Sequence, residues 1–360
     1  MSETDETRRS SDDSVDDEDL VAQYLEDQRF HGKAERTRAS YERVLRAFEA
    51  FLADPERGPG EVSTTPAAAD RRECMAWVHA LRDSHASSTV ASYASYVHRF
   101  YAYMTQVGEL ADNPMALVVE EMDEAIDPDP TRRDLSIGDV RGFVADVRHP
   151  LERAVVVTLL KTGMRVGECC NLDLRDLHLP DSAARAAFDV EPRVHLQGRG
   201  ASLYVPAEPT RGAVVNGEER YESNKRKRDT VIPVDAELRR VLEAWLAVRP
   251  DVRSPAAPLF VDTSEAWGER VRASGVRSFV TRHARDAGWY RTGGGASENV
   301  TPHYFRHFFT THLRDRTGDR GVVKYLRGDV ASDVIDTYTH DWGSRIRDVY
   351  ESNIYSLLED

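Results

Sequence analysis

The sequence predicts a mainly α-helical protein with a small antiparallel β-sheet, divided into two domains. Apolar residues recur at helical spacing over most of the 360 residues. Between residues 190 and 234 this pattern gives way to short stretches that alternate polar and apolar residues, as strands do. A charged segment broken by prolines, residues 120–130, separates two helical regions. Since 40% of the chain is hydrophobic, each region can bury a core of its own.

Residues 18–118 are predicted to form a helical domain. The acidic composition of residues 1–17 predicts a disordered tail before it. Ser87 and Ser88 are expected to cap the last helix, and Gly108 is expected to end it. Residues 119–133 are expected to form a linker. Four apolar stripes predict the four helices of the domain: Leu20–Leu25, Tyr41–Leu52, Met75–Leu81 and Val90–Met104.

The second domain is predicted over residues 134–360. Ser136 should cap a helix that reaches Val147, and Pro150 should begin a helix that ends at Gly163. A short helix should follow from Arg165. Three strands are predicted, at Arg193–Leu196, Ser202–Val205 and Asp229–Val234. Further helices are predicted at Leu238–Val248, Val271–Ala287, Pro302–Arg314, Arg320–Leu326, Val334–Tyr338 and Ile346–Leu358.

The charge balance is strongly acidic and the basic residues are almost all arginine. The net charge is −14, and only five of the 48 basic residues are lysines. This composition predicts a halophilic origin, because molar salt screens the self-repulsion of an acidic surface. Acidity therefore does not exclude a nucleic-acid partner, although counterion release would contribute little to binding in such salt.

The three cysteines, Cys74, Cys169 and Cys170, lack the spacing of metal ligands and are expected to be small buried residues with reduced thiols. No apolar run approaches the ~20 residues of a membrane helix, and the N-terminus lacks the pattern of a signal peptide. These observations predict a cytoplasmic protein without membrane partners.

Two residues in the segment Thr301–His312 suit phosphate chemistry. Pro302 should begin a helix, so that His303 and Arg306, three residues apart, share one face. A titratable imidazole can move a proton, and a neighbouring permanent cation can hold an anionic transition state. A buried, hydrogen-bonded histidine beside a surface arginine would produce the same sequence pattern.

Three further residues have both a functional and an ordinary interpretation. Arg165 can contact a phosphate or can form a salt bridge to Glu168. Lys225 lies in a basic cluster, residues 225–228, which is either functional or a solvated turn. Tyr338, at the end of a short predicted helix, is either a nucleophile or a core residue.

Four segments, in this order, resemble the catalytic domain of the tyrosine recombinase (phage integrase/Xer) family. They are Leu160–Glu168, Lys225–Val234, Pro302–His312 and Asp336–His340, and their spacing agrees with the family over residues 134–345. The first domain resembles the family's helical core-binding (SAM-like) domain.

The resemblance implies the role of each site residue. Tyr338 would attack a DNA phosphate and form a 3′-phosphotyrosine link, while Arg165 and Arg306 hold the phosphate oxygens. Lys225, or Lys227 as a reserve candidate, would protonate the leaving 5′-oxygen, and His303 would accept a proton. The reaction would need neither cofactor nor metal ion. Double-stranded DNA would be the partner, with a homotetramer on paired sites and a monomer or dimer off DNA.

Asp329 departs from the family pattern, since it stands nine residues before Tyr338 where His or Trp is usual. A carboxylate there should repel a phosphate. Three interpretations are open. Asp329 orients Arg306 or another donor, Asp329 is protonated in a closed site, or the enzyme is slow or inactive; we favour the first.

The alternatives to a site-specific recombinase are a catalytically weak or inactive DNA-binding protein and a type IB topoisomerase-like nicking-closing enzyme. The C-terminal helix should pack on its own domain or dock on a neighbouring protomer.

Overall fold

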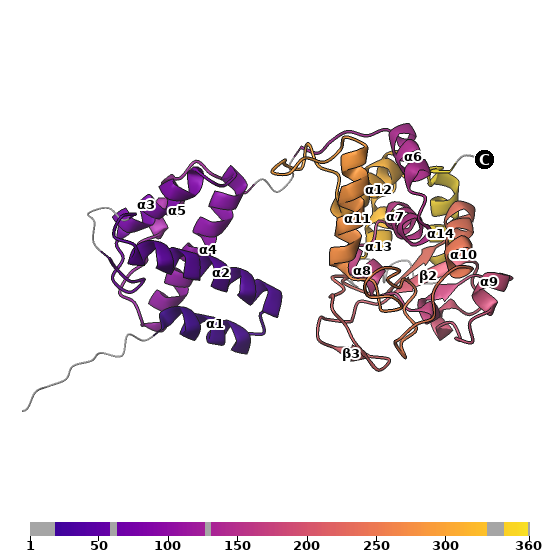
Figure 1. The fold of residues 1–360 in the computed structure, drawn as a ribbon, viewed down its shortest axis with the longest axis horizontal. Coiled ribbons are helices and arrows are strands. Elements are labelled where there is room, and N and C mark those ends of the chain that lie inside the picture. Colours follow the sequence, from indigo (N-terminus) through magenta and orange to yellow (C-terminus); the bar gives the residue numbers. More distant parts are fainter. Residues whose placement is uncertain (1–18, 58–62, 127–130, 330–341, 359–360) are drawn as a thin grey trace, which may run out of the picture. The chain divides into compact units, whose positions relative to one another are not determined.

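The computed structural model describes residues 19–57, 63–126, 131–329 and 342–358. The chain forms two compact units, Met1–Asp129 and Pro130–Asp360 (Figure 1). The predicted acidic tail, residues 1–17, lies outside the described residues. Within the described residues, no helix is both long and apolar enough to cross a membrane.

The N-terminal unit is helical and is built around aromatic side chains. Tyr24 meets Phe100 edge-on, and Phe48 meets Trp77 in the same way, with all four rings buried. The four predicted helices are present, together with a fifth that is too short to show a periodicity in the sequence. They are α1 (Leu20–Phe30), α2 (Glu35–Ala53), α3 (Arg71–Arg82), α4 (Ser87–Val107) and α5 (Ala116–Glu121).

The ends of α4 confirm one predicted signal and contradict another. Gly108 ends the helix in the left-handed region, at φ 91°, as predicted. The predicted cap at Ser87 or Ser88 is wrong, because the N-cap is Ala86 and no side chain caps the helix. Ser88 lies inside the helix, where its carbonyl accepts a hydrogen bond from the Ser92 hydroxyl instead.

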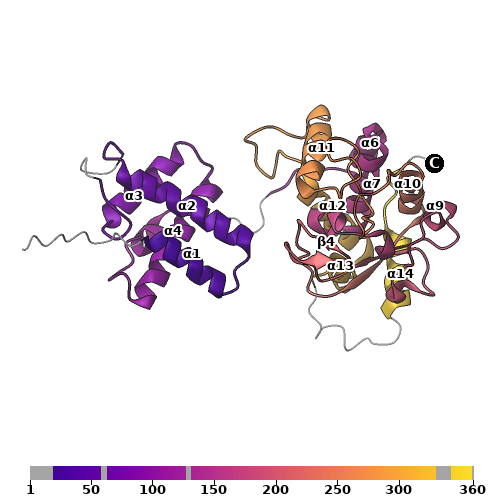
Figure 2. The same cartoon turned by 60° about the horizontal axis from the view of Figure 1, so that its bottom comes forward.

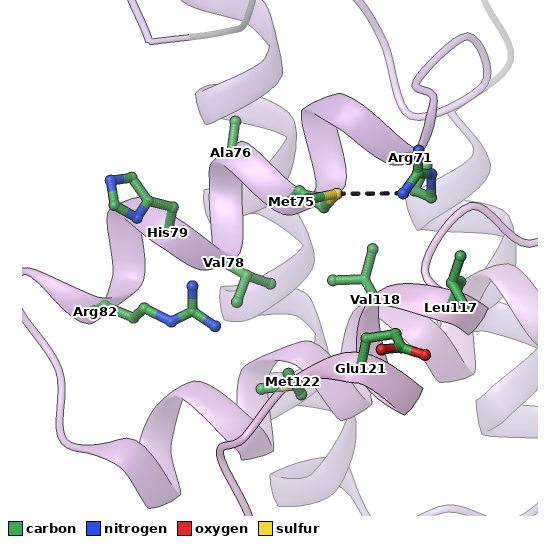
Figure 3. A pocket seen from close by; sticks show the side chains of 10 residues that line it. All are labelled: Arg71, Met75, Ala76, Val78, His79, Arg82, Leu117, Val118, Glu121 and Met122. Atoms are coloured by element: carbon green, nitrogen blue, oxygen red, sulfur yellow. Dashed lines mark hydrogen bonds between the residues drawn. The ribbon is translucent and has the colours of Figure 1, made fainter.

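A groove of about 440 Å³ lies between α3 and α5 in the N-terminal unit. Apolar side chains from both helices line it, and Arg71 and Arg82 lie at its edges (Figure 3). Met75 and Leu117, which are about half exposed, contribute to its wall. None of the predicted catalytic residues lines this groove.

The C-terminal unit is organised around α7, which runs through its centre (Figures 1 and 2). Helices α11 and α12 lie on one side of α7, and α10 lies on the other. Residues Leu159 and Leu160 are fully buried for this reason, as is the run Val155–Val157. The helices are α6 (Ile137–Asp146), α7 (Pro150–Thr162), α8 (Val166–Cys170), α9 (Ala183–Ala186), α10 (Ala236–Leu246), α11 (Ala273–Asp286), α12 (Pro302–Thr317), α13 (Arg320–Arg327) and α14 (Trp342–Asn353).

The three-stranded sheet has the order β1-β2-β5 and is antiparallel throughout. Its strands are β1 (Leu177–His178), β2 (Ser202–Val205) and β5 (Thr230–Pro233), and Leu203 pairs with Ile232. The predicted strands at 202–205 and 229–234 are therefore confirmed.

The predicted strand at Arg193–Leu196 is wrong: Val194–Leu196 forms a single 3-10 turn. This turn exposes Val194 and buries Leu196, so it imitates the alternation of a strand over a few residues. A second sheet, β3 (Val214–Val215) and β4 (Glu218–Glu219), was not predicted. The pair Asn216-Gly217 between them has positive φ at both residues, which is the usual signal of a tight hairpin.

The C-terminal segment packs on its own unit, which was one of the two interpretations. Tyr350 and Tyr355 are buried, and their hydroxyl groups donate to carbonyl oxygens of α7. In return, Lys161 of α7 donates to the Tyr355 carbonyl oxygen. Backbone amides at residues 357 and 358 donate to Glu237. Truncation after Ser344 would therefore uncover the core rather than remove only an assembly contact.

Low pH should weaken the packing of the C-terminal segment on its unit, because Glu237 takes part in that packing. Burial alone would raise the pKa of Glu237, but hydrogen bonds from Lys161, Ser356 and the Leu357 amide outweigh it and lower the pKa to about 2. A lowered pKa contributes stability above the ordinary value of 4.5, and that stability is lost as the pH falls towards 2. We expect the free energy of unfolding to fall over this range, and a Glu237→Gln variant to show a shallower fall in urea titrations. An unchanged slope in the variant would contradict the assignment.

Candidate active site

Arg165 is placed by the sharp end of α7. Gly163 adopts φ 61°, and a Cβ there would stand 2.2 Å from the Phe309 ring, so both conformation and space require glycine. The chain then turns into α8 with Arg165 at its N-cap. The predicted pair with Glu168 is present, since Arg165 Nη1 lies 3.1 Å from Glu168 Oε1. The second terminal nitrogen, Nη2, lies 3.1 Å from Asp329 Oδ1.

Arg306 is the buried member of the predicted pair on α12. Its Nη1 donates to the carbonyl oxygens of Gly163 (2.7 Å) and Arg327 (3.0 Å), and its Nη2 donates to Asp329 Oδ1 (2.7 Å). Burial lowers the pKa of Arg306 to about 10, against the influence of Asp329, so it stays charged at neutral pH. The alternative of a buried histidine beside a surface arginine is wrong, because Arg306 is buried and His303 is exposed.

His303 lies one turn before Arg306, at the start of α12, with Pro302 at the first helical position as predicted. Although the residue is exposed, partial burial of its ring lowers its pKa, and the charges of Arg132, Arg306 and Arg165 lower it further. The imidazole is therefore neutral at pH 7 and can accept a proton.

The low pKa of His303 predicts the pH dependence of DNA cleavage. The rate should stay level around neutral pH and fall in acid with an inflection below 6.5, because only neutral His303 accepts a proton. An Arg132→Gln variant removes one of the charges and should move the inflection upwards. The measurement is single-turnover cleavage against pH, with His303→Gln as the variant that should lack the inflection. An inflection that persists in His303→Gln would belong to another group.

Asp329 joins the two arginines. It follows Gly328, which ends α13 in the left-handed region at φ 71°. Its Oδ1 accepts hydrogen bonds from both Arg165 and Arg306, and its Oδ2 lies 2.9 Å from Arg327 Nε. Three guanidinium groups thus surround one carboxylate. This is the arrangement expected of an aspartate that orients arginines, and it does not leave an isolated negative charge in the site.

The loop that carries the candidate proton donor adjoins this cluster. We call residues 224–228, between β4 and β5, the Lys225 loop. Lys225 and Lys227 are both exposed there. Arg165 Nη1 donates to the Lys225 carbonyl oxygen at 3.3 Å, and the Lys227 amide donates to the Gly328 carbonyl oxygen at 2.9 Å. Tyr338 belongs to residues 330–341, outside the described residues.

Two buried residues of the cluster were missed as functional candidates. Glu168 was expected only as a salt-bridge partner of Arg165, but it is fully buried and also lies 3.2 Å from Arg226 Nε. Arg226 was part of the basic cluster that had either a functional interpretation, centred on Lys225, or that of a solvated turn, and its side chain is buried. Burial lowers the pKa of Arg226, against the influence of Glu168. Its place between two lysines in an arginine-rich chain offered no signal of burial.

The cluster carries an excess of positive charge. Among the described residues it combines four guanidinium groups, those of Arg165, Arg226, Arg306 and Arg327, with the carboxylates of Glu168 and Asp329. Two positive charges remain, together with the exposed lysines of the loop. Such a site suits a phosphodiester whose negative charge grows in a pentavalent transition state.

Arginines elsewhere on the C-terminal unit are engaged in ordinary contacts. Arg282 Nη2 lies 2.6 Å from both carboxylate oxygens of Glu152, and Arg285 lies over the Tyr290 ring. Both side chains therefore have the contacts of ordinary surface residues.

Both units of the chain are similar to known proteins. Residues 146–344 match the sequence profile of the phage integrase family, and residues 21–108 match the phage integrase N-terminal SAM-like domain. The tyrosine recombinase XerC of Pelobacter propionicus is 24% identical over 329 residues, which cover 90% of this chain and 92% of that protein. XerD of Listeria monocytogenes is 24% identical over 327 residues, with 89% and 93% covered.

Solved structures show the same fold. The Tn1549 transposon integrase in complex with a circular intermediate DNA superposes with a TM-score of 0.62 at 17% identity, covering 89% of this chain and 95% of that one. A lambda integrase tetramer bound to a Holliday junction gives a TM-score of 0.58 at 14% identity, covering 87% and 76%. The family profile spans more than half of the sequence and includes the arginine cluster. This chain belongs to the phage integrase family of tyrosine recombinases.

Proposed function

We propose that this chain is a site-specific DNA recombinase that cuts and rejoins DNA through a 3′-phosphotyrosine intermediate. The observation that carries the proposal is the convergence of Arg165 and Arg306 on Asp329, beside His303 and the Lys225 loop. Family membership supports the reaction type. The tyrosine recombinases XerC and XerD named above align with this chain over nearly their whole length.

Each step can be assigned to a side chain. The Tyr338 oxygen attacks the phosphorus atom while neutral His303 accepts the phenolic proton. Arg165 and Arg306 stabilise the charge that develops on the non-bridging oxygens. The bond from phosphorus to the 5′-oxygen breaks as Lys225 delivers a proton to that oxygen. Attack by a 5′-hydroxyl group of another strand reverses these transfers, so rejoining consumes no high-energy compound.

A nicked suicide substrate tests the proposal. A nick beside the scissile bond lets the short strand diffuse away and traps the covalent intermediate. The unaltered protein should form an adduct that resists denaturation, and Tyr338→Phe should form none. DNA binding without an adduct, at high as well as low salt, would favour the inactive DNA-binding alternative. Relaxation of supercoiled plasmid without site preference would favour the topoisomerase-like alternative.

Double-stranded DNA is the proposed partner, bound by both units. Residues 18–118 and 134–360 would hold the duplex, with residues 119–133 as the connection. Known structures of lambda integrase include a dimer bound to a core site and a tetramer bound to a Holliday junction. By analogy, this chain would form a tetramer on paired sites and a monomer or dimer off DNA. Its three cysteines are free and buried, which suits the reducing cytoplasm where we expect it to work.

A halophilic origin, also proposed, predicts that salt stabilises the fold. With a net charge of −14, raising KCl from 0.1 M to molar levels should raise the melting temperature, because screening relieves repulsion among surface carboxylates. Scanning calorimetry at a series of KCl concentrations measures this. A melting temperature that falls or stays constant would contradict the proposed origin.

A further inference from the structure

Arg226 lies between the Lys225 loop and the turn that carries Asp329. It stands between two exposed lysines, yet its side chain is buried. Its Nε lies 3.2 Å from Glu168 Oε2, and its Nη1 donates to the Leu326 carbonyl oxygen at 3.0 Å. A buried guanidinium is costly unless it is paired, so these partners determine where the side chain lies.

The fit against Gly328 is equally close. A Cβ at position 328 would stand 2.7 Å from Arg226 Cγ and 2.6 Å from its Nη1. Glycine is thus needed at 328 for the space that Arg226 occupies as well as for its positive φ. The stem and the head of the arginine both rest on the end of α13.

Consecutive residues of the Lys225 loop are each tied to the active site. The Lys225 carbonyl oxygen accepts a hydrogen bond from Arg165, and the Lys227 amide donates to Gly328. Arg226, between them, is the contact of this loop that uses a buried side chain and reaches both Glu168 and α13. Loss of Arg226 would leave residues 225–227 attached to the active site through the backbone hydrogen bonds of the two lysines, while the side chains of Asn224 and Arg228 would still hold the two ends of the loop.

We infer that Arg226 is a positioning residue for the lysine that protonates the leaving 5′-oxygen. The inference rests on the proposed function. In the cleavage step a proton passes from the lysine ammonium group to the 5′-oxygen as the phosphorus–oxygen bond breaks. General acid catalysis needs hydrogen-bond distance between these atoms, and a displaced loop lengthens it. Because both candidate lysines flank Arg226, the inference holds whichever of them is the acid.

Two substitutions separate the geometry of Arg226 from its charge. Arg226→Lys keeps a positive charge beside Glu168, but one nitrogen cannot reach both Glu168 and the Leu326 carbonyl oxygen. Arg226→Met keeps a similar stem and loses both contacts. Should the methionine variant fail to fold, the lysine variant still decides the question, and melting temperatures show which variants are folded.

The test compares two DNA substrates that differ in one atom. One has oxygen and the other sulfur at the bridging 5′ position of the scissile phosphate. A thiolate is a good leaving group and departs without a proton, so the sulfur substrate does not need the general acid. Lys225→Met and Lys227→Met serve as benchmarks, since only the variant of the true acid should regain its rate on sulfur.

Both Arg226 variants should form the Tyr338 adduct about 10²-fold more slowly on the oxygen substrate. On the sulfur substrate they should react within a few-fold of the unaltered protein. Arg228→Met is the matched control: it removes a guanidinium from the same loop, one that lies 5.3 Å from the Tyr325 ring. It should cleave the oxygen substrate at nearly the normal rate when DNA is saturating.

An equal loss on both substrates would overturn the inference, because it would show that Arg226 supports the phosphate site in general. A normal rate on oxygen would also overturn it. Failure of the proposed function is a different result, in which the unaltered protein forms no Tyr338-dependent adduct with either substrate.

Discussion

Replacing Arg306 by alanine should slow covalent cleavage of DNA by at least about 10²- to 10³-fold, the loss expected for one preorganised donor to a developing oxyanion. The buried guanidinium of Arg306 is held by two carbonyl oxygens and Asp329. It is therefore already in place before the reaction, and no free energy is spent on reorienting it as the transition state forms. Single-turnover adduct formation at saturating DNA measures the effect on chemistry alone.

The matched control for this variant is Arg314→Ala, on the same helix. Arg314 is about half exposed, and within the described part of the chain its side chain pairs with its neighbour Asp315. Its removal should change the rate by a small factor at most. If Arg306→Ala lost DNA affinity but kept its rate of cleavage once bound, Arg306 would have a binding role and not a role in the transition state.

Replacing Asp329 by asparagine should also slow cleavage, by about 10²-fold, because arginines that are displaced by a fraction of an ångström lose much of their effect. The carboxylate sits among Arg165, Arg306 and Arg327. Without its charge these groups repel one another, and the second carboxylate oxygen, which faces Arg327, is replaced by an NH2 group that cannot accept a hydrogen bond. The measurement is again single-turnover cleavage, with the exposed Asp315→Asn as control.

Asp329→His provides the opposite test, because it restores the residue type usual for the family at this position. If Asp329 orients the arginines, the histidine variant should cleave no faster than the unaltered protein. A much faster variant would mean that the aspartate impairs the enzyme. That result would favour the alternative of a slow or inactive protein.

The local signals in the sequence predicted many of the element boundaries that place the site. Gly163 ends α7, Ser136 caps α6 and Pro302 begins α12, each by a property of that residue alone. Strands β2 and β5 followed from their alternation and their length. Shorter elements were missed or mistaken, since one turn at Val194–Leu196 looks like a strand over so few residues.

The partners of the site residues depend on tertiary packing and could not be predicted from local pattern. In the sequence Asp329 has the wrong charge for a phosphate site, because nothing there shows that three guanidinium groups meet around it. The burial of Arg226 could not be predicted, because it depends on space left by Gly328 on a distant turn. The assignment of Arg165, Lys225, His303, Arg306 and Tyr338 came from the ordered resemblance to a family, since each residue alone also had an ordinary interpretation.

The most direct measurement is to identify the amino acid and the DNA end that are joined in the trapped adduct. Digestion of the adduct with trypsin and nuclease, followed by mass spectrometry, reads both. We predict a 3′-phosphate linked to Tyr338. A link to another residue, a 5′-phosphate link, or the same adduct from Tyr338→Phe would contradict the account of the active site.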